Sequence, residues 1–132
     1  MRGVSAEDVA VVRLIYELWA KGERAGHLID PELEYVNPEY AIEAGTSKGR
    51  GTLGRIRDVY PDFRVEPERF LDAGESVVVI GVACGTSTSG VEVRWRQGYI
   101  WEVRDGRAVS FRWFSDPAEA LAEAGVPDAA PD

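Results

Sequence analysis

The stretch VEVRWRQGYIWEVRDGRAVSFRWF, residues 91–114, decides the fold of this chain. It contains two extended runs with large aromatic residues at alternate positions, the pattern of strands that bury one face. Asp105 and Gly106 lie between the runs and tolerate the positive φ that a two-residue turn needs to match the twist of paired strands. We therefore predict a hairpin of residues 91–103 and 108–114, with a bulge or bend at Gly98 because the first strand is long.

The residues on either side of this hairpin extend the pattern in both directions. Strands are predicted at residues 63–71 and 76–86, which makes the second half of the chain a meander. Toward the N-terminus we predict helices at residues 5–21, 23–29 and 52–60, a short strand at 33–37 and a loop at 39–51. After the hairpin, Asp116 and Pro117 mark the start of a last helix, which ends at Gly125.

Helices followed by an antiparallel meander and a short closing helix define an α+β domain. The first helix is apolar over most of its circumference, so we expect it to pack against one face of the sheet. The expected architecture is a cone-shaped, strongly bent antiparallel sheet packed on the N-terminal helices. With 132 residues and 14.5 kDa, the chain fits one domain over residues 1–126 and a frayed tail at 127–132.

Composition and charge exclude several classes of function. Fifteen basic and 23 acidic residues give a net charge of −8, and no window is basic enough to bind nucleic-acid phosphates. Apolar runs are too short to span a membrane and we see no secretory signal, so we expect a cytoplasmic protein that binds neither nucleic acid nor membrane. Because Cys84 and His27 are the single cysteine and histidine, we expect no disulfide within the chain, no metal and no cofactor.

Alternate residues of the strands place aromatic side chains on one face. The three sets that we assign to this face are Tyr99, Trp101 and Val103; Phe111, Trp113 and Ser115; and Ile80, Val82 and Cys84. If the face lines the inside of the cone, it forms an aromatic-walled pocket. The alternatives are that these side chains fill the core or bury a dimer interface.

Several short motifs together share the order and spacing of a known superfamily. They are Lys21-Gly22-Glu23, residues 33–37 before Pro38, Lys48-Gly49-Arg50-Gly51, WEVRDGR at 101–107 and FSDPAEAL at 114–121. Over residues 5–125 the chain resembles the nuclear transport factor 2-like superfamily, in its SnoaL-like and ketosteroid isomerase-like branch, and residues 35–49 resemble a bacterial subgroup of it. The resemblance implies a cystatin-like roll with a cavity between sheet and helices.

The resemblance also implies that two copies pair through the outer face of the sheet. Arg94, Arg96 and Arg112 alternate with tryptophans, so we expect their guanidinium groups on an exposed sheet face. Such a face fits a symmetric interface between two copies of the chain.

The catalytic positions of ketosteroid isomerase can be carried over onto this sequence. Its general-base aspartate corresponds to Asn37, which cannot take a proton, and its oxyanion-hole aspartic acid falls near Tyr99. The tyrosine of its first helix falls near Ile15, next to Tyr16. The resemblance therefore implies no steroid isomerase activity, although Tyr99 could still donate a hydrogen bond to a carbonyl oxygen.

We predict that the chain binds a small apolar molecule of a cyclic or polyketide-like kind. The residues predicted to line the site are Tyr16, Trp19, Tyr35, Asn37, Ile80, Val82, Trp101, Phe111 and Trp113. The first alternative is an isomerase, cyclase or hydratase that acts on a polyketide- or steroid-like substrate. Glu43, or an ordered water held by Asn37, would transfer the proton, and Tyr99 or Tyr35 would polarise an oxygen. The second is a dimeric scaffold or partner-binding module with a filled interior.

Overall fold

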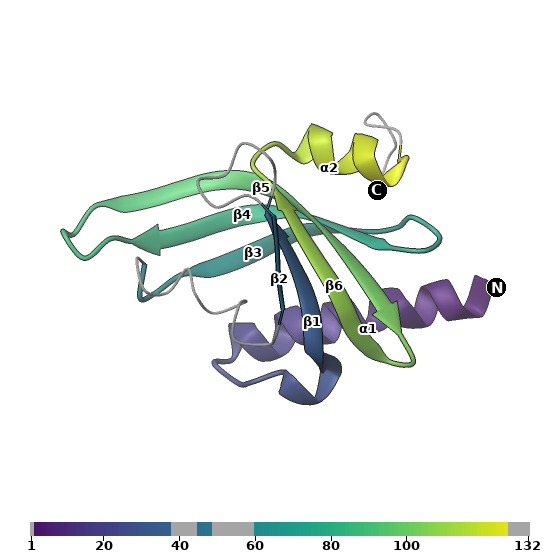
Figure 1. Ribbon diagram of the computed structural model, residues 1–132. Coiled ribbons are helices and arrows are strands. Elements are labelled where there is room, and N and C mark those ends of the chain that lie inside the picture. Colours follow the sequence, from purple (N-terminus) through teal and green to yellow (C-terminus); the bar gives the residue numbers. More distant parts are fainter. Residues whose placement is uncertain (1, 38–44, 49–59, 127–132) are drawn as a thin grey trace.

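One mixed sheet with a helix on each side forms the described part of the molecule (Figure 1). The computed structural model describes residues 2–37, 45–48 and 60–126. The helices are α1 (Arg2–Ala20), the 3-10 turn η1 (Gly26–Leu28) and α2 (Pro117–Ala124). The strands are β1 (Ile29–Asn37), β2 (Gly45–Lys48), β3 (Arg64–Asp72), β4 (Val77–Thr86), β5 (Glu92–Arg104) and β6 (Arg107–Phe114).

The strands lie side by side in the order β2-β1-β6-β5-β4-β3. Neighbouring strands are antiparallel except β1 and β6, which run parallel. The α+β class is confirmed, but the expectation of a wholly antiparallel sheet is wrong at this one pair. A meander predicts only the pairing of successive strands, whereas β1 and β6 are joined through all the elements between them.

Local sequence signals predict the hairpin and the last helix correctly. Asp105 and Gly106 have φ of 54° and 79°, as the turn between β5 and β6 requires. The Asp116 carboxylate accepts a hydrogen bond of 2.9 Å from the backbone N–H of Ala118 and caps α2. The helix ends at Gly125, whose φ is 78°.

The segments before the meander differ from the prediction in three places. Residues 23–29 form only the single turn η1, and the strand predicted at 33–37 begins earlier, at Ile29, with a register shift before Glu34. The loop expected at 39–51 contains β2, which pairs with β1 through Thr46 and Val36. Of the helix predicted at 52–60, all but the last residue lies outside the described residues.

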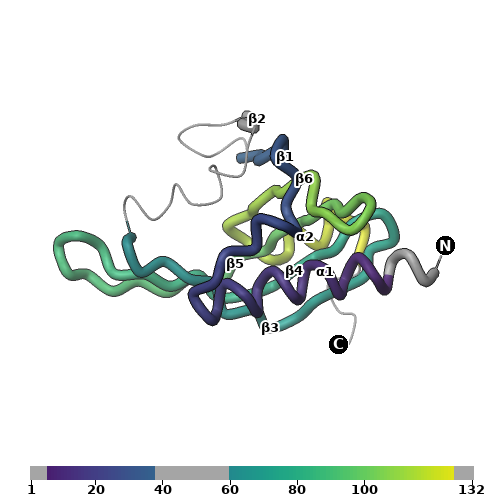
Figure 2. Tube along the Cα trace, turned by 90° about the horizontal axis from the view of Figure 1, so that it is seen from below, coloured from purple at the N-terminus to yellow at the C-terminus, as the bar shows by residue number. Residues whose placement is uncertain are grey.

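The two helices pack on opposite faces of the sheet, as Figures 1 and 2 show. The inner face, covered by α1, carries one buried cluster that includes Ile15, Val79 and Trp101. The outer face, covered by α2, carries a second cluster that includes Ile80 and Leu121. The expectation that α1 packs on one face therefore holds, and α2 buries the other. Neither α1 nor α2 is long and apolar enough to cross a membrane.

Gly98 allows α2 to lie close to the centre of β5. A Cβ atom at Gly98 would be 2.5 Å from the Ala120 Cβ and 3.2 Å from the Pro117 Cα. The pairing of β5 with β4 runs without a shift through Gly98, so the predicted bulge is wrong there. The register shift of β5 lies instead between Glu102 and Val103, opposite β6. The glycine therefore serves the approach of the helix.

We predict that Gly98→Ala lowers the free energy of unfolding by about 1–3 kcal/mol, because the added methyl group overpacks the contact with α2. Urea denaturation of the purified variant measures this. Gly26→Ala is the matched control, since a Cβ at Gly26 meets nothing within 4 Å. Equal midpoints for Gly98→Ala and the wild type would contradict the assigned role.

Candidate ligand-binding site

The inner faces of β4, β5 and β6 are free of charged side chains in the part of the chain that the structure describes. Strand residues alternate between faces, and paired residues lie on the same face. The inner-facing residues are Val77, Val79, Gly81 and Ala83 of β4, Trp95, Gln97, Tyr99 and Trp101 of β5, and Phe111 and Trp113 of β6. The charged residues of β5 and β6 within these spans, such as Arg94, Arg96 and Arg112, occupy the alternate, outer positions.

Aromatic rings form a continuous surface on this inner face. Phe111 is at its centre, with ring centroids 5.2 Å from Tyr35, 5.6 Å from Tyr99 and 4.6 Å from Trp101. From α1, Tyr16 packs edge-on against Trp101 at 5.9 Å, and Trp19 lies 6.0 Å from the same ring. We call these residues, together with Trp113 and its partner Asn37, the aromatic face.

Three polar contacts are set into the aromatic face. The Trp101 indole N–H donates to the Tyr16 hydroxyl oxygen at 3.1 Å. The Tyr99 hydroxyl donates to Gln97 Oε1 at 2.6 Å, and the Trp113 indole N–H donates to Asn37 Oδ1 at 2.6 Å. All six groups are uncharged, so the face combines apolar rings with neutral hydrogen-bonding groups.

Both buried tyrosines keep their protons at physiological pH. Burial raises the pKa of Tyr16 well above its ordinary value of 10.0, and the hydrogen bond from Trp101 offsets this only in part. Burial also raises the pKa of Tyr99, with smaller contributions from the nearby Tyr16 and Tyr35. Both hydroxyls therefore act as neutral groups.

Seven of the nine residues predicted to line the site lie on the aromatic face: Tyr16, Trp19, Tyr35, Asn37, Trp101, Phe111 and Trp113. Tyr99, a catalytic candidate, lies there too. Glu43, the other candidate, lies outside the described residues.

The prediction that Ile80 and Val82 share this face is wrong. Ile80 pairs with Gly98 and packs in the outer cluster with α2, and Val82 pairs with Arg96 on the same outer side. Cys84, assigned to the same face, pairs with Arg94 and is buried beneath it. Nine of the ten residues of β4 are apolar or glycine, so its sequence shows no alternation from which the orientation could be derived.

Sequence reasoning also missed Gln97, which is only 8% exposed and holds the Tyr99 hydroxyl. Gln97 directly follows Arg96, so the sequence around it does not indicate that its side chain is buried. The signal that could have found it is the alternation of β5, since Gln97 has the same parity as Tyr99 and Trp101.

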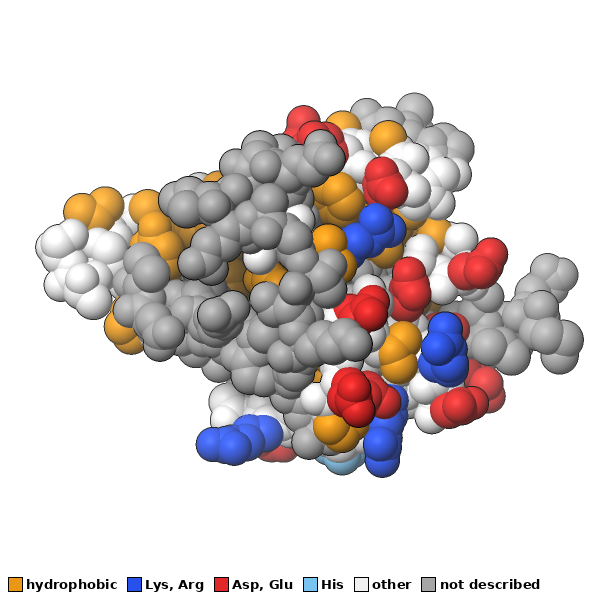
Figure 3. Space-filling model, viewed as in Figure 1, with side chains coloured by type: hydrophobic (Ala, Val, Ile, Leu, Met, Phe, Trp, Pro, Cys, Tyr) orange, Lys and Arg blue, Asp and Glu red, His pale blue; other side chains and the backbone are white. Residues whose placement is uncertain are grey.

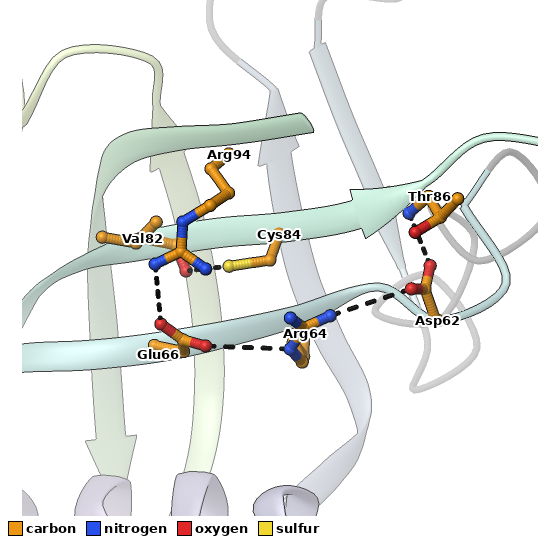
Figure 4. A network of polar contacts seen from close by, with 7 residues as sticks. All are labelled: Asp62, Arg64, Glu66, Val82, Cys84, Thr86 and Arg94. Atoms are coloured by element: carbon orange, nitrogen blue, oxygen red, sulfur yellow. Dashed lines mark hydrogen bonds and ion pairs between the residues drawn. The ribbon is translucent and has the colours of Figure 1, made fainter. Parts of the chain in front are cut away.

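The outer face of the strands carries charge instead (Figure 4). Arg94 bonds Glu66 at 3.0 Å, Arg96 bonds Glu68 at 2.8 Å, and Arg64 lies between Asp62 and Glu66 at 3.8 Å from each. These groups are about half exposed, and such pairs contribute little to stability. The expectation that Arg94 and Arg96 lie on an exposed sheet face is confirmed. Acidic and basic side chains are also interspersed over the right half of Figure 3.

A cleft adjoins the aromatic face where Phe70 packs edge-on against Tyr16, with 5.8 Å between the ring centroids. This cleft of about 290 Å³ lies at β3 and α1, lined by Pro67, Glu68, Arg69, Phe70, Leu71 and Arg13. The Arg13 guanidinium is 4.5 Å from the centre of the Phe70 ring. No cluster of three His, Cys, Asp or Glu side chains suited to a metal ion is present among the described residues.

Comparison with known proteins identifies the class of this fold. An NTF2-like protein from Burkholderia pseudomallei is 25% identical and has a TM-score of 0.68 over 88% of this chain and 95% of its own. TerC, crystallised with polyporic acid, is 26% identical, with a TM-score of 0.68 over 89% and 97% of the two chains. A protein with a ketosteroid isomerase-like fold from Catenulispora acidiphila is 21% identical, with a TM-score of 0.65 over 92% and 97%. The fold is that of the NTF2-like proteins.

Within that class, the model of the SnoaL-like domain matches residues 12–111. The chain therefore belongs to the SnoaL-like family, as its motifs indicate. The comparison with curated proteins gives no match.

We predict that the ionisation of Tyr16 and Tyr99 leaves the free energy of unfolding nearly unchanged between about pH 8 and 9 and lowers it above about pH 10. Above pH 10 the unfolded chain loses protons that Tyr16 and Tyr99 retain in the folded state, so ionisation favours unfolding. Each group contributes a slope of about 1.4 kcal/mol per pH unit there. Urea denaturation between pH 8 and 11 should give a smaller slope for Tyr99→Phe than for the wild type. Equal slopes would show that Tyr99 ionises as readily in the folded protein as in the unfolded chain.

Proposed function

We propose that this SnoaL-like protein binds a small, apolar, ring-bearing molecule on the aromatic face. The observation that carries the proposal is the uncharged inner surface of β4–β6, on which aromatic rings surround two neutral carboxamides, Asn37 and Gln97. Aromatic walls with a few placed polar groups are typical of small-molecule sites. Burying a polar group costs free energy unless the group is paired. An interior that served only to stabilise the fold would therefore gain nothing from buried carboxamides.

The relatives support the same kind of ligand. TerC, which is 26% identical over nearly the whole chain, was crystallised with polyporic acid. By analogy, we assign the ligand of this chain to small organic molecules, with the aromatic face as the surface that holds it.

We favour binding over proton transfer as the function of this face. The described inner surface of β4–β6 has no carboxylate to act as a base, and Asn37 stands where the resemblance places one. The Tyr99 hydroxyl already donates its proton to Gln97, so it does not offer that proton to a substrate oxygen. An enzyme that uses Glu43 as base and Tyr99 as donor is the alternative, and it requires this hydrogen bond to break.

We predict that 2-isopropylnaphthalene or 2-isopropylanthracene binds with one molecule per chain and a Kd of about 100 μM or below. Equilibrium dialysis measures the affinity, and mass spectrometry of small molecules that copurify with the chain searches for the natural ligand. Trp113→Leu should weaken binding about tenfold because it removes a ring from the face. Leu14→Ala, at a 40% exposed leucine of α1, is the control that should leave it unchanged. Binding of neither compound would refute the proposal.

We further propose that two copies pair through the outer sheet face. Arg64, Glu66, Arg94 and Arg96 form a ladder of both signs there, and a twofold axis can set the arginines of one copy against the glutamates of the other. The ladder is half exposed in one chain, so it remains accessible to a second.

We expect light scattering after size exclusion to give twice the mass of the chain for the wild type. The double variant Arg94→Glu, Arg96→Glu should shift the protein toward one chain, because it leaves a ladder dominated by negative charge. Arg13→Glu, an exposed change on α1, is the control for added charge. A monomeric wild type would contradict pairing.

A further inference from the structure

The sequence contains one asparagine and one glutamine, and the fold brings both to the aromatic face. Tyr35 of β1 pairs with Phe111 of β6, so Asn37 follows beside Trp113. Trp113 in turn pairs with Tyr99 of β5. Gln97 precedes Tyr99 by two residues in β5, so it lies on the same side of the sheet. The two carboxamides therefore flank the row formed by Trp113 and Tyr99.

Each carboxamide is held through its oxygen. The Trp113 indole N–H can only donate, so the atom of Asn37 that lies 2.6 Å from it must be the oxygen. Gln97 Oε1 accepts the proton of the Tyr99 hydroxyl, also at 2.6 Å. Among the described residues, neither amide nitrogen donates to a protein acceptor. Within the described part of the chain, both side chains are therefore oriented with no protein acceptor for their NH₂ groups.

The surroundings decide which ligand group suits these NH₂ donors. The inner surface of β4–β6 carries no positive charge in its described residues, so an anion placed there would be desolvated without a counter-ion. Each carboxamide oxygen already accepts one hydrogen bond from the protein, whereas neither NH₂ group has a described protein acceptor, so an acceptor on the ligand is what these side chains lack. A neutral oxygen acceptor on an apolar ring, such as a ketone or quinone carbonyl, satisfies both conditions.

We propose that the site selects neutral carbonyl compounds, whose oxygen accepts a hydrogen bond from the NH₂ group of Gln97 or Asn37. The inference rests on the proposed function and specifies the class of its ligand. In this arrangement Tyr99 and Trp113 are positioning residues, because each holds a carboxamide in the orientation that presents nitrogen to the ligand.

Nuclear magnetic resonance can test this on the unmodified chain. Because the sequence has one Asn and one Gln, the ¹⁵N-labelled protein gives two pairs of side-chain NH₂ signals. We expect 2-acetylnaphthalene or 2-acetylanthracene to move at least one pair downfield. The isopropyl analogues have the same shape without the oxygen and should move these pairs much less. If the acetyl compounds shift backbone signals but leave both NH₂ pairs as the isopropyl compounds do, the inference is overturned.

Equilibrium dialysis of variants gives an independent measurement. The quantity compared is the Kd of the isopropyl compound divided by that of its acetyl analogue. In Gln97→Glu, Asn37→Asp, oxygens replace both NH₂ groups while the acceptors for Tyr99 and Trp113 remain, so the ratio should decrease about tenfold. Arg104→Gln, Arg107→Gln in the exposed turn of the β5–β6 hairpin is the control, since this double variant also lowers the charge of the chain by two units and should leave the ratio unchanged.

Tyr99→Phe separates positioning from a structural role. It frees the Gln97 carboxamide to turn, so the ratio should decrease while the isopropyl compound keeps its affinity within about threefold. An unchanged ratio in both Tyr99→Phe and the carboxamide double variant refutes the inference, while continued binding of the isopropyl compounds leaves the proposed function standing. If neither kind of compound binds the wild type, both proposals fail.

Discussion

The two-residue alternation of β5, at the centre of the meander, is the constraint on which the rest of the molecule depends. From Val93 to Val103, every second side chain is uncharged and lies on the inner face, and the residues between are charged, glycine or isoleucine and lie on the outer face. The strand thereby separates two chemical environments across the thickness of one sheet. β4 and β6 have their inner and outer faces fixed by β5, because directly paired residues lie on the same face of the sheet.

Local signals were sufficient for about half of the fold. The turn at Asp105 and Gly106 and the caps of α2 depend only on residues within a few positions, so they could be predicted from sequence. The parallel pairing of β1 with β6 is a contact between segments distant in the sequence, and no residue pattern within β1 predicts it. The bulge expected at Gly98 was wrong for the same reason, because the close neighbour of this glycine is α2 and the strand pairing runs through it without a shift.

The candidate site was predictable where alternation was visible. Aromatic residues at every second position of β5 and β6 placed Tyr99, Trp101 and Phe111 together correctly. In β4 almost every residue is apolar, so either orientation buries valines equally well, and Ile80 was assigned to the wrong face. The hydrogen bond that orients Asn37 joins β1 to β6, and the one that orients Gln97 depends on how two side chains of β5 turn toward each other, so neither could be derived from the sequence.

Two of the three hydrogen bonds of the aromatic face also join residues far apart in the sequence. The Trp101–Tyr16 bond joins residues 85 positions apart, and the Trp113–Asn37 bond joins residues 76 apart. Closing loops of this length costs chain entropy that neighbouring strands do not incur. The meander can assemble from local pairings, but the aromatic face is complete only after α1 and β1 have docked. No fragment confined to one half of the polypeptide can reproduce the aromatic face, so this face is a property of the complete topology.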